Sequence, residues 1–170
     1  LDPGLFQRFF RDLGQDVPLV SIDARPFPVK IRWFPQRRGD FDEVIESVCQ
    51  TVADIHHSDE PGDVLVFLSG AAGIRRCEER LGQLGVGRGG VVLPLYGALT
   101  RDEQERIFDD FGSTRKIVLS TNVAETSVTV PGVRHVIDTG LVKVMHVHPK
   151  SGIRALREEM VSRASAEQRA

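Results

Sequence analysis

Apolar positions from residue 40 onward fall into two alternating patterns. One is a short, mainly apolar run, which is typical of a strand covered on both faces. The other has apolar residues every three or four positions, which predicts an amphipathic helix. The runs are 64–68, 91–95, 116–120 and 133–138, and the helical positions are Phe41, Val44, Ile45, Val48, Val52 and Ile55, then Ile74, Cys77, Leu81 and Leu84, then Ile107, Phe108 and Phe111. This alternation predicts βαβ units and an α/β fold, in which helices flank a parallel sheet.

Capping signals mark where several helices begin. Asp40 with Glu43, and Thr100 with Glu103, have the spacing of a side chain that caps the amide three residues later. A last helix is predicted to begin near Ser162. The pattern before it, at Val142, Val144 and Val147, predicts a further strand within a hairpin.

The first 39 residues show no such alternation. Asp2 and Pro3 predict the start of a short helix. Its apolar stripe is Leu5, Phe6, Phe9, Phe10 and Leu13. Helix-disfavouring prolines follow at positions 26, 28 and 35. The positions Val29, Ile31 and Trp33 alternate as in a half-buried strand, and we interpret residues 24–39 as a connector into the main domain.

Composition fits a soluble globular domain, with 41% hydrophobic and 27% charged residues among 170. The net charge of −2 gives no electrostatic sign of a nucleic-acid binder, so such binding must be argued from motifs. No apolar run approaches the roughly 18 residues of a membrane span. Cys49 and Cys77 fall on apolar helix faces, which predicts buried, reduced thiols and a cytoplasmic protein. We interpret Leu1 and Ala170 as cut points.

Several kinds of site are disfavoured by spacing. The glycines at 85–90 precede a strand, whereas a dinucleotide-binding loop follows one, so they are interpreted as a loop that ends a helix. His146 and His148 match no zinc pattern and are interpreted as solvent-facing residues of an edge strand, so no metal site is predicted. The Gly-x-x-x-x-Gly-Lys-Ser/Thr loop that cradles a triphosphate is absent from the sequence.

Short polar side chains gather after the third apolar run. They are Ser120, Thr121, Asn122, Thr126, Ser127 and Thr129. Ligands of parallel sheets bind at the carboxyl ends of the strands, which directs attention to 69–70, 96–97, 121–122 and 138–140. Short hydroxyl and amide groups there can donate hydrogen bonds to phosphate oxygens. The same residue types also favour helix caps, so spacing alone leaves both interpretations open.

Several segments together resemble the DEAH-box (DEAH/RHA) ATP-dependent RNA helicases, and most of all the bacterial HrpA type. LSTNVAETSVTVPGVRHVIDTG resembles motif V of that family, SRASAEQRA the opening of motif VI, LVFLSG motif IV and LPLYGALTRDEQERIF the segment after it. ARPFPVKIRWFP resembles the linker between the family's two motor domains. The resemblance covers nearly the whole chain in the family's order.

The resemblance implies a three-layer RecA-like fold of the P-loop NTPase type, in which helices flank a parallel sheet and a small β-hairpin extends from it. Residues 1–25 would be a remnant of the first RecA-like domain and the linker. Residues 26–170 would be the second RecA-like domain, cut within motif VI. The strand-separating hairpin of the family would lie within residues 141–157.

Site residues also follow from the resemblance. The positions that match RNA-contacting residues of the family are Ser69, Gly70, Thr121 and Asn122. Ser127 matches a serine that senses the nucleotide state, and Thr129 with the chain beside it approaches the nucleotide. Pro131 stands where family members often have an acidic residue that meets the ribose, so that contact is in doubt. Gln168 matches the catalytic glutamine that faces the terminal phosphate and the attacking water.

The resemblance therefore implies the second motor domain of an ATP-dependent RNA helicase, which unwinds RNA or remodels RNA–protein complexes. The parent protein would use ATP and Mg²⁺, bind single-stranded RNA through its phosphates, and hold this domain against the first RecA-like domain. The isolated chain would be a monomer that binds neither cofactor and lacks the Walker A loop, the DEAH box and the arginine fingers. A non-catalytic helicase-like binding or scaffold domain, and a DNA helicase domain, are the alternatives.

Overall fold

The computed structural model describes residues 3–20, 28–34, 40–126, 129–149 and 151–170. The chain divides between Trp33 and Phe34 into two compact units, which are described separately. Among the described helices, none is long and apolar enough to cross a membrane.

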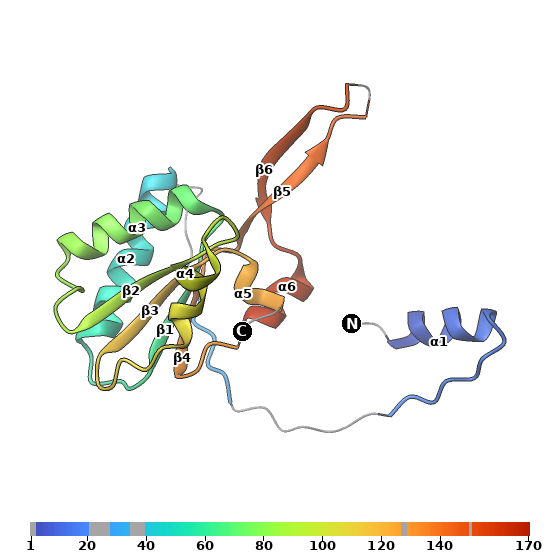
Figure 1. Ribbon diagram of the computed structural model, residues 1–170, viewed down its shortest axis with the longest axis horizontal. Helices are drawn as coiled ribbons and strands as arrows, with labels where there is room; N and C mark the ends of the chain where they lie inside the picture. Colours follow the sequence, from blue (N-terminus) through green and yellow to red (C-terminus); the bar gives the residue numbers. More distant parts are fainter. Residues whose placement is uncertain (1–2, 21–27, 35–39, 127–128, 150) are drawn as a thin grey trace. The chain divides into compact units, whose positions relative to one another are not determined.

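The first unit contains the helix α1, Pro3–Asp12, at the predicted position (Figure 1). The predicted cap Asp2 lies outside the described residues. None of the residues of α1 is buried, and Leu5, Phe6 and Phe9 are more than half exposed. The strand predicted at 29–33 is wrong, because residues 28–34 are exposed and pair with no neighbouring strand among the described residues. An alternating pattern becomes a strand only where a partner supplies the hydrogen bonds.

The second unit is built on a parallel sheet, as the alternating apolar runs predicted. Its strands are β1 (Asp63–Phe67), β2 (Gly90–Leu95), β3 (Arg115–Ser120) and β4 (Val133–Asp138), in the order β2-β3-β1-β4. Val64 lies opposite Ile117 on one side and His135 on the other, so β1 is paired along both edges. β2 and β4 are the edge strands of this sheet.

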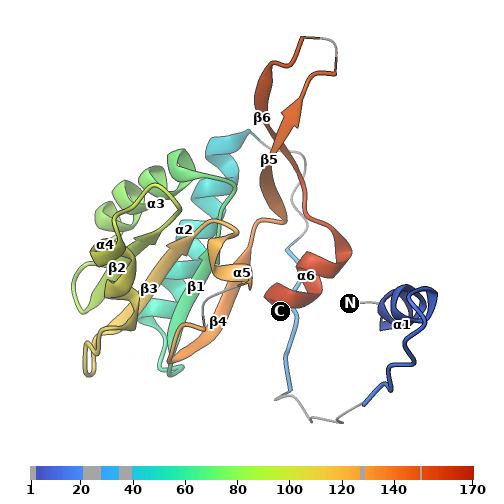
Figure 2. The same cartoon turned by 45° about the vertical axis from the view of Figure 1, so that its right-hand side comes forward.

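Helices cover both faces of the sheet (Figures 1 and 2). The helices α2 (Phe41–His57) and α3 (Ala71–Gln83) pack on one face against Val64, Val66 and Ile117. The other face buries Leu65 and Val118 beneath α4 (Arg101–Glu105), the 3-10 helix η1 (Arg106–Phe108) and α5 (Val123–Thr126). Neighbouring residues of one strand thus belong to two different cores, which gives the three predicted layers.

Most of the predicted helix starts are confirmed, but one helix is shorter than predicted. Thr100 and Glu103 form a complete capping box at the start of α4, while Asp40 precedes α2 without a side-chain bond. The helical pattern predicted through Phe111 ends at Phe108. The carboxylate of Asp110 instead accepts a hydrogen bond from the amide of Gly112 at 2.8 Å, and this local turn competes with further helix.

The two cysteines lie on the buried faces of α2 and α3, as predicted. Cys49 and Cys77 are free and fully buried. The Sγ atom of Cys49 lies 3.8 Å from the carbonyl oxygen of Cys77, so the two helices are closely packed at this point.

The end of the chain forms an antiparallel hairpin and a last helix. The hairpin pairs β5 (Leu141–Val147) with β6 (Arg154–Met160) and projects from the sheet (Figure 2). All seven residues of β6 are exposed. The helix α6 (Arg163–Arg169) begins as predicted, with the hydroxyl of Ser162 accepting a hydrogen bond from the amide of Ser165 at 3.1 Å.

The glycine cluster after α3 ends that helix, as the sequence predicted. The amide of Val86 donates to the carbonyl of Leu81 at 3.1 Å, and the amide of Gly85 donates to Gly82 at 3.2 Å. Gly85 has a φ of 76°, in the left-handed region that side chains disfavour. These bonds form a Schellman motif, in which Val86 folds back into the core beside Leu81.

We expect Gly85→Ala to lower the free energy of unfolding by about 1 kcal/mol, because a Cβ disfavours the left-handed backbone. Gly87→Ala is the matched control, since a Cβ there meets nothing within 4 Å and its φ is outside that region. The control should be neutral or raise stability by about 0.5 kcal/mol. Urea denaturation of both variants measures the difference, and equal effects would contradict the assignment of Gly85 as the helix terminator.

Candidate functional site

The parallel strands bring the predicted polar segments to one edge of the sheet. The residues that follow the strand ends are Tyr96 after β2, Thr121 after β3, Ser69 after β1 and Thr139 after β4. Backbone bonds continue past the strands: the amide of Thr121 donates to Leu95 at 3.1 Å, and the amide of Thr139 donates to Phe67 at 3.3 Å. These bonds fix the positions of the loops at this carboxyl edge.

Thr121 and Asn122 lie directly before α5, with Thr121 half-buried and Asn122 exposed. The first turn of α5 uses their backbone carbonyls, which accept hydrogen bonds from Ala124 at 3.4 Å and Glu125 at 3.1 Å. Among the described residues, no hydrogen bond engages the side chain of Thr121 or Asn122. The helix turn therefore forms without these polar side chains, which stay available to a ligand.

Ser69 and Gly70 are half-buried and lie at the base of the β5–β6 hairpin. The hydroxyl of Ser69 donates a hydrogen bond to the carboxylate of Glu158 on β6. A Cβ on Gly70 would come within 3.2 Å of the side chain of Lys143 on β5, so this side chain packs closely over the glycine. The two positions are thus in contact with the hairpin, a relation that the sequence did not reveal.

Of the predicted nucleotide-side residues of motif V, Pro131 lies away from the carboxyl edge. Ser127 lies outside the described residues. Thr129 and Pro131 are exposed, with the buried Val130 between them. Pro131 lines a cavity of about 290 Å³ together with Asp63, the first residue of β1, and so lies at the opposite, amino edge of the sheet.

Gln168 lies on α6, where its side chain is exposed and its Nε2 donates to the backbone carbonyl of Glu125 at 3.0 Å. α6 is thereby attached to α5, the helix that follows Thr121 and Asn122. The predicted residues of motifs V and VI, although more than 40 positions apart, are brought into one neighbourhood by this bond.

Next to Gln168 is a cluster of charged residues that was not among the predicted site residues. Arg169 is nearly fully buried, with its side chain 2% exposed. Its guanidinium group donates to the carboxylate of Glu125 at 2.9 Å and to the carboxylate of Asp138 at 3.0 Å. Its Cζ lies 4.7 Å from the centre of the Phe67 ring, within reach of a cation–π interaction.

Glu125 is held in its charged form by this cluster. Burial acts to raise the pKa of its carboxyl group, but hydrogen bonds from Ser165 and Arg169 and the nearby guanidinium charge outweigh burial and lower the pKa below its ordinary value. A charged Glu125 balances the buried charge of Arg169. Of this cluster, only Asp138 carried a sequence signal, because it ends the last apolar run and lies at a strand end.

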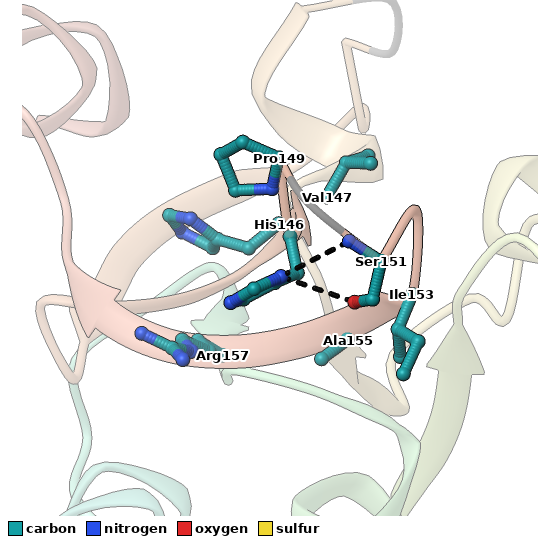
Figure 3. A pocket seen from close by; sticks show the side chains of 8 residues that line it. His146, Val147, Pro149, Ser151, Ile153, Ala155 and Arg157 are labelled. Carbon is teal, nitrogen blue, oxygen red and sulfur yellow. Dashed lines mark hydrogen bonds between the residues drawn. The ribbon is translucent and has the colours of Figure 1, made fainter.

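The hairpin carries a second cavity of about 480 Å³ near its tip (Figure 3). It is lined by residues of β5, β6 and the turn between them, including His146, Ser151 and Arg157. The predicted solvent-facing position of His146 is confirmed in part, since its side chain is 42% exposed and its Nε2 lies 2.7 Å from Glu159. None of the predicted site residues lines this cavity.

The carboxyl edge carries hydroxyl and amide groups beside the carboxylates of Glu125, Asp138 and Glu158. Hydroxyl and amide groups of Thr121, Asn122 and Gln168 are neutral donors of the kind that bind phosphate oxygens. Across the described parts of the chain, no three His, Cys, Asp or Glu side chains cluster as metal ligands.

Comparison with known proteins agrees with this geometry. The model of the helicase conserved C-terminal domain matches residues 43–169. The chain is 38% identical over its whole length to a probable ATP-dependent RNA helicase, the DHX35 homolog of Caenorhabditis elegans, and spans 24% of that protein. It is 35% identical over 99% of its length to the ATP-dependent RNA helicase HrpA of Escherichia coli, of which it spans 13%.

A solved structure shows the same fold. The crystal structure of the DEAH/RHA helicase HrpB of Escherichia coli superposes with a TM-score of 0.76 at 34% identity, over 95% of this chain and 20% of that chain. This likeness confirms the predicted RecA-like architecture. The family match, the DEAH-box relatives and the parallel sheet together show that the chain belongs to the helicase conserved C-terminal domain family, in its DEAH-box branch.

Proposed function

We propose that this chain is the second motor domain of an ATP-dependent RNA helicase, and that Thr121 and Asn122 bind the RNA backbone. The observation that carries the proposal is the position of these two side chains. They lie at the carboxyl edge of the sheet, make no side-chain hydrogen bond within the described part of the chain, and belong to the segment that resembles motif V. Donors in that position can bind phosphates without distinguishing bases. Ser69 and Gly70 extend the same surface beside the hairpin.

On the nucleotide side, the proposal assigns Gln168 to the terminal phosphate and attacking water of ATP, and Ser127 and Thr129 to sensing the nucleotide. Pro131 has no side-chain group that could bind a ribose hydroxyl. The sequence holds no triphosphate-binding loop, so the phosphates and Mg²⁺ of ATP would be held by the first RecA-like domain of the whole protein. Binding and hydrolysis of ATP would close and open the cleft between the two domains.

The proposed domain boundary follows from the resemblance. Residues 1–25 belong to the first RecA-like domain and linker, and residues 26–170 to the second. The exposed stripe of α1, with Phe6 and Phe9, is consistent with a helix whose packing partner belongs to that first domain. The buried, free cysteines fit a reducing compartment, so the proposal includes a cytoplasmic protein. It also includes that the isolated chain is a monomer.

Weak, salt-sensitive RNA binding is part of the proposal. The chain has a net charge of −2, so few phosphate charges would be neutralised when RNA binds. Contacts to phosphates do not detect the 2′-hydroxyl that distinguishes RNA from DNA. A DNA strand is therefore the competitor that tests RNA preference in binding experiments.

In the full-length protein, we expect Thr121→Ala to raise about tenfold the RNA concentration that half-maximally stimulates ATP hydrolysis. The reason is the loss of a hydrogen bond to a charged phosphate, which is worth about 1.5 kcal/mol. Unstimulated hydrolysis should change less. Steady-state ATPase assays over a range of single-stranded RNA concentrations measure both quantities.

Thr114→Ala is the matched control for Thr121→Ala. Thr114 precedes β3 and Thr121 follows it, and both are half-buried, so the same atoms are removed at opposite edges of the sheet. Equal losses of stimulated and unstimulated activity in Thr121→Ala, or the same shift in Thr114→Ala, would contradict an RNA-facing role for Thr121.

We also expect the 170-residue chain alone to show no turnover of ATP with Mg²⁺, with or without RNA, under conditions in which the full-length protein is active. It lacks a phosphate-binding loop, and the guanidinium group of Arg169 is committed to Glu125 and Asp138. An arginine that stabilises the transferring phosphoryl group is worth about 10³–10⁵ in rate. Phosphate release assays make the comparison. Turnover by the isolated chain would refute the proposal that the first RecA-like domain is needed to hold the phosphates of ATP.

A further inference from the structure

The side chain of Arg169 uses all of its guanidinium nitrogens inside the protein. Nε and Nη2 each lie 2.9 Å from Oε2 of Glu125, and Nη1 lies 3.0 Å from Oδ1 of Asp138. With the side chain 2% exposed, no nitrogen is left to face a ligand. Arg169 therefore acts through the residues that it holds.

Those residues stand on separate elements. Glu125 lies on α5, Asp138 ends β4, and Phe67 ends β1. The single cation at the end of α6 thus joins three parts of the carboxyl edge. A second bond, from Gln168 Nε2 to the backbone carbonyl of Glu125, joins α6 to α5 directly.

α5 needs this attachment more than the longer helices do. It has four residues, which is one turn and too short to be stable by its own hydrogen bonds. Ala124 is its buried apolar residue, and Glu125 is its charged anchor. Since Thr121 and Asn122 immediately precede α5, a shift of that turn would move both side chains.

We propose that Arg169 is a positioning residue that couples the nucleotide side of this domain to its RNA side. By holding Glu125, it keeps α5 and the Thr121–Asn122 segment where they can meet an RNA phosphate, and it is itself adjacent to Gln168. Movement of α6 on the nucleotide side is transmitted to the RNA contact through this ion pair. The inference rests on the proposed function and deepens it.

Removal of the guanidinium group has a defined electrostatic consequence. Glu125 and Asp138 would then face each other without their shared cation, and Glu125 has a side chain only 10% exposed. Two carboxylates in a partly buried site repel each other. We expect α5 to move away from β4, which displaces Thr121 and Asn122.

The test uses the full-length protein with Arg169→Gln, Glu125→Gln and the double variant. The measurement is ATP hydrolysis over a range of concentrations of single-stranded polyuridylate. We expect each single variant to raise the RNA concentration for half-maximal stimulation at least tenfold. The double variant should be no worse than the more affected single variant, within about twofold, because both substitutions break one link.

Arg163→Gln is the matched control. Arg163 lies on the same helix and pairs with Glu167 at 2.9 Å, but its side chain is 91% exposed. We expect this variant to keep the wild-type RNA requirement. Glu125→Gln keeps the shape of the side chain but removes its charge and replaces one of its two acceptor oxygens with a donor, so it breaks the ion pair and remains informative if Arg169→Gln folds poorly.

Four outcomes would overturn the inference. If only Arg169→Gln raises the RNA requirement, or if the two effects multiply in the double variant, Arg169 acts on the ligand directly. If both single variants lose thermal stability yet need no more RNA than Arg163→Gln, the cluster is structural only. A wild-type protein without RNA-stimulated hydrolysis would instead refute the proposed function, and the coupling with it.

Discussion

The two central strands of the sheet, β1 and β3, are buried on both faces. This constraint limits the positions at which the domain can carry polar side chains. Alternate residues of β1 and β3 enter one core or the other, so neither strand has a solvent face. Lys116, at the amino end of β3, is buried only because its Nζ donates to the carbonyl of Ile107 at 2.7 Å and lies 3.8 Å from Asp63. Within β1 and β3, polar side chains are otherwise confined to the strand ends, where parallel pairing aligns them.

The sequence predicted this framework because the relevant signals are local. Apolar runs, helical spacing and the Thr100–Glu103 capping box each span a few residues, and the corresponding elements were found where expected. The errors have local causes as well. Residues 28–34 have the alternation of a strand without a pairing partner, and a turn at Asp110 stops a helix whose apolar pattern continues to Phe111. Pattern alone does not show which of two competing hydrogen-bond arrangements is the more stable.

The site was predicted less completely for a different reason. The polar cluster that contains Thr121 and Asn122 is visible in one segment after a buried strand, but the RNA-contacting role expected of these two residues came from the family resemblance. The ion pairs of Arg169 join it to Glu125, 44 positions away, and to Asp138, 31 positions away, and no spacing rule relates such residues. Only the sheet order β2-β3-β1-β4 brings the ends of β1 and β4 together beneath α6. The order of the strands in the sheet, and not a local sequence pattern, therefore determines long-range charge clusters of this kind.

The contact between Ser69 and Glu158 has a consequence for how any strand could approach this edge. A hydroxyl group has one proton to donate, and here the carboxylate on β6 accepts it. A phosphate oxygen that takes the same proton must first displace that carboxylate. Under the proposed function, RNA binding at Ser69 would therefore exchange one anion, the carboxylate of Glu158, for another, the phosphate.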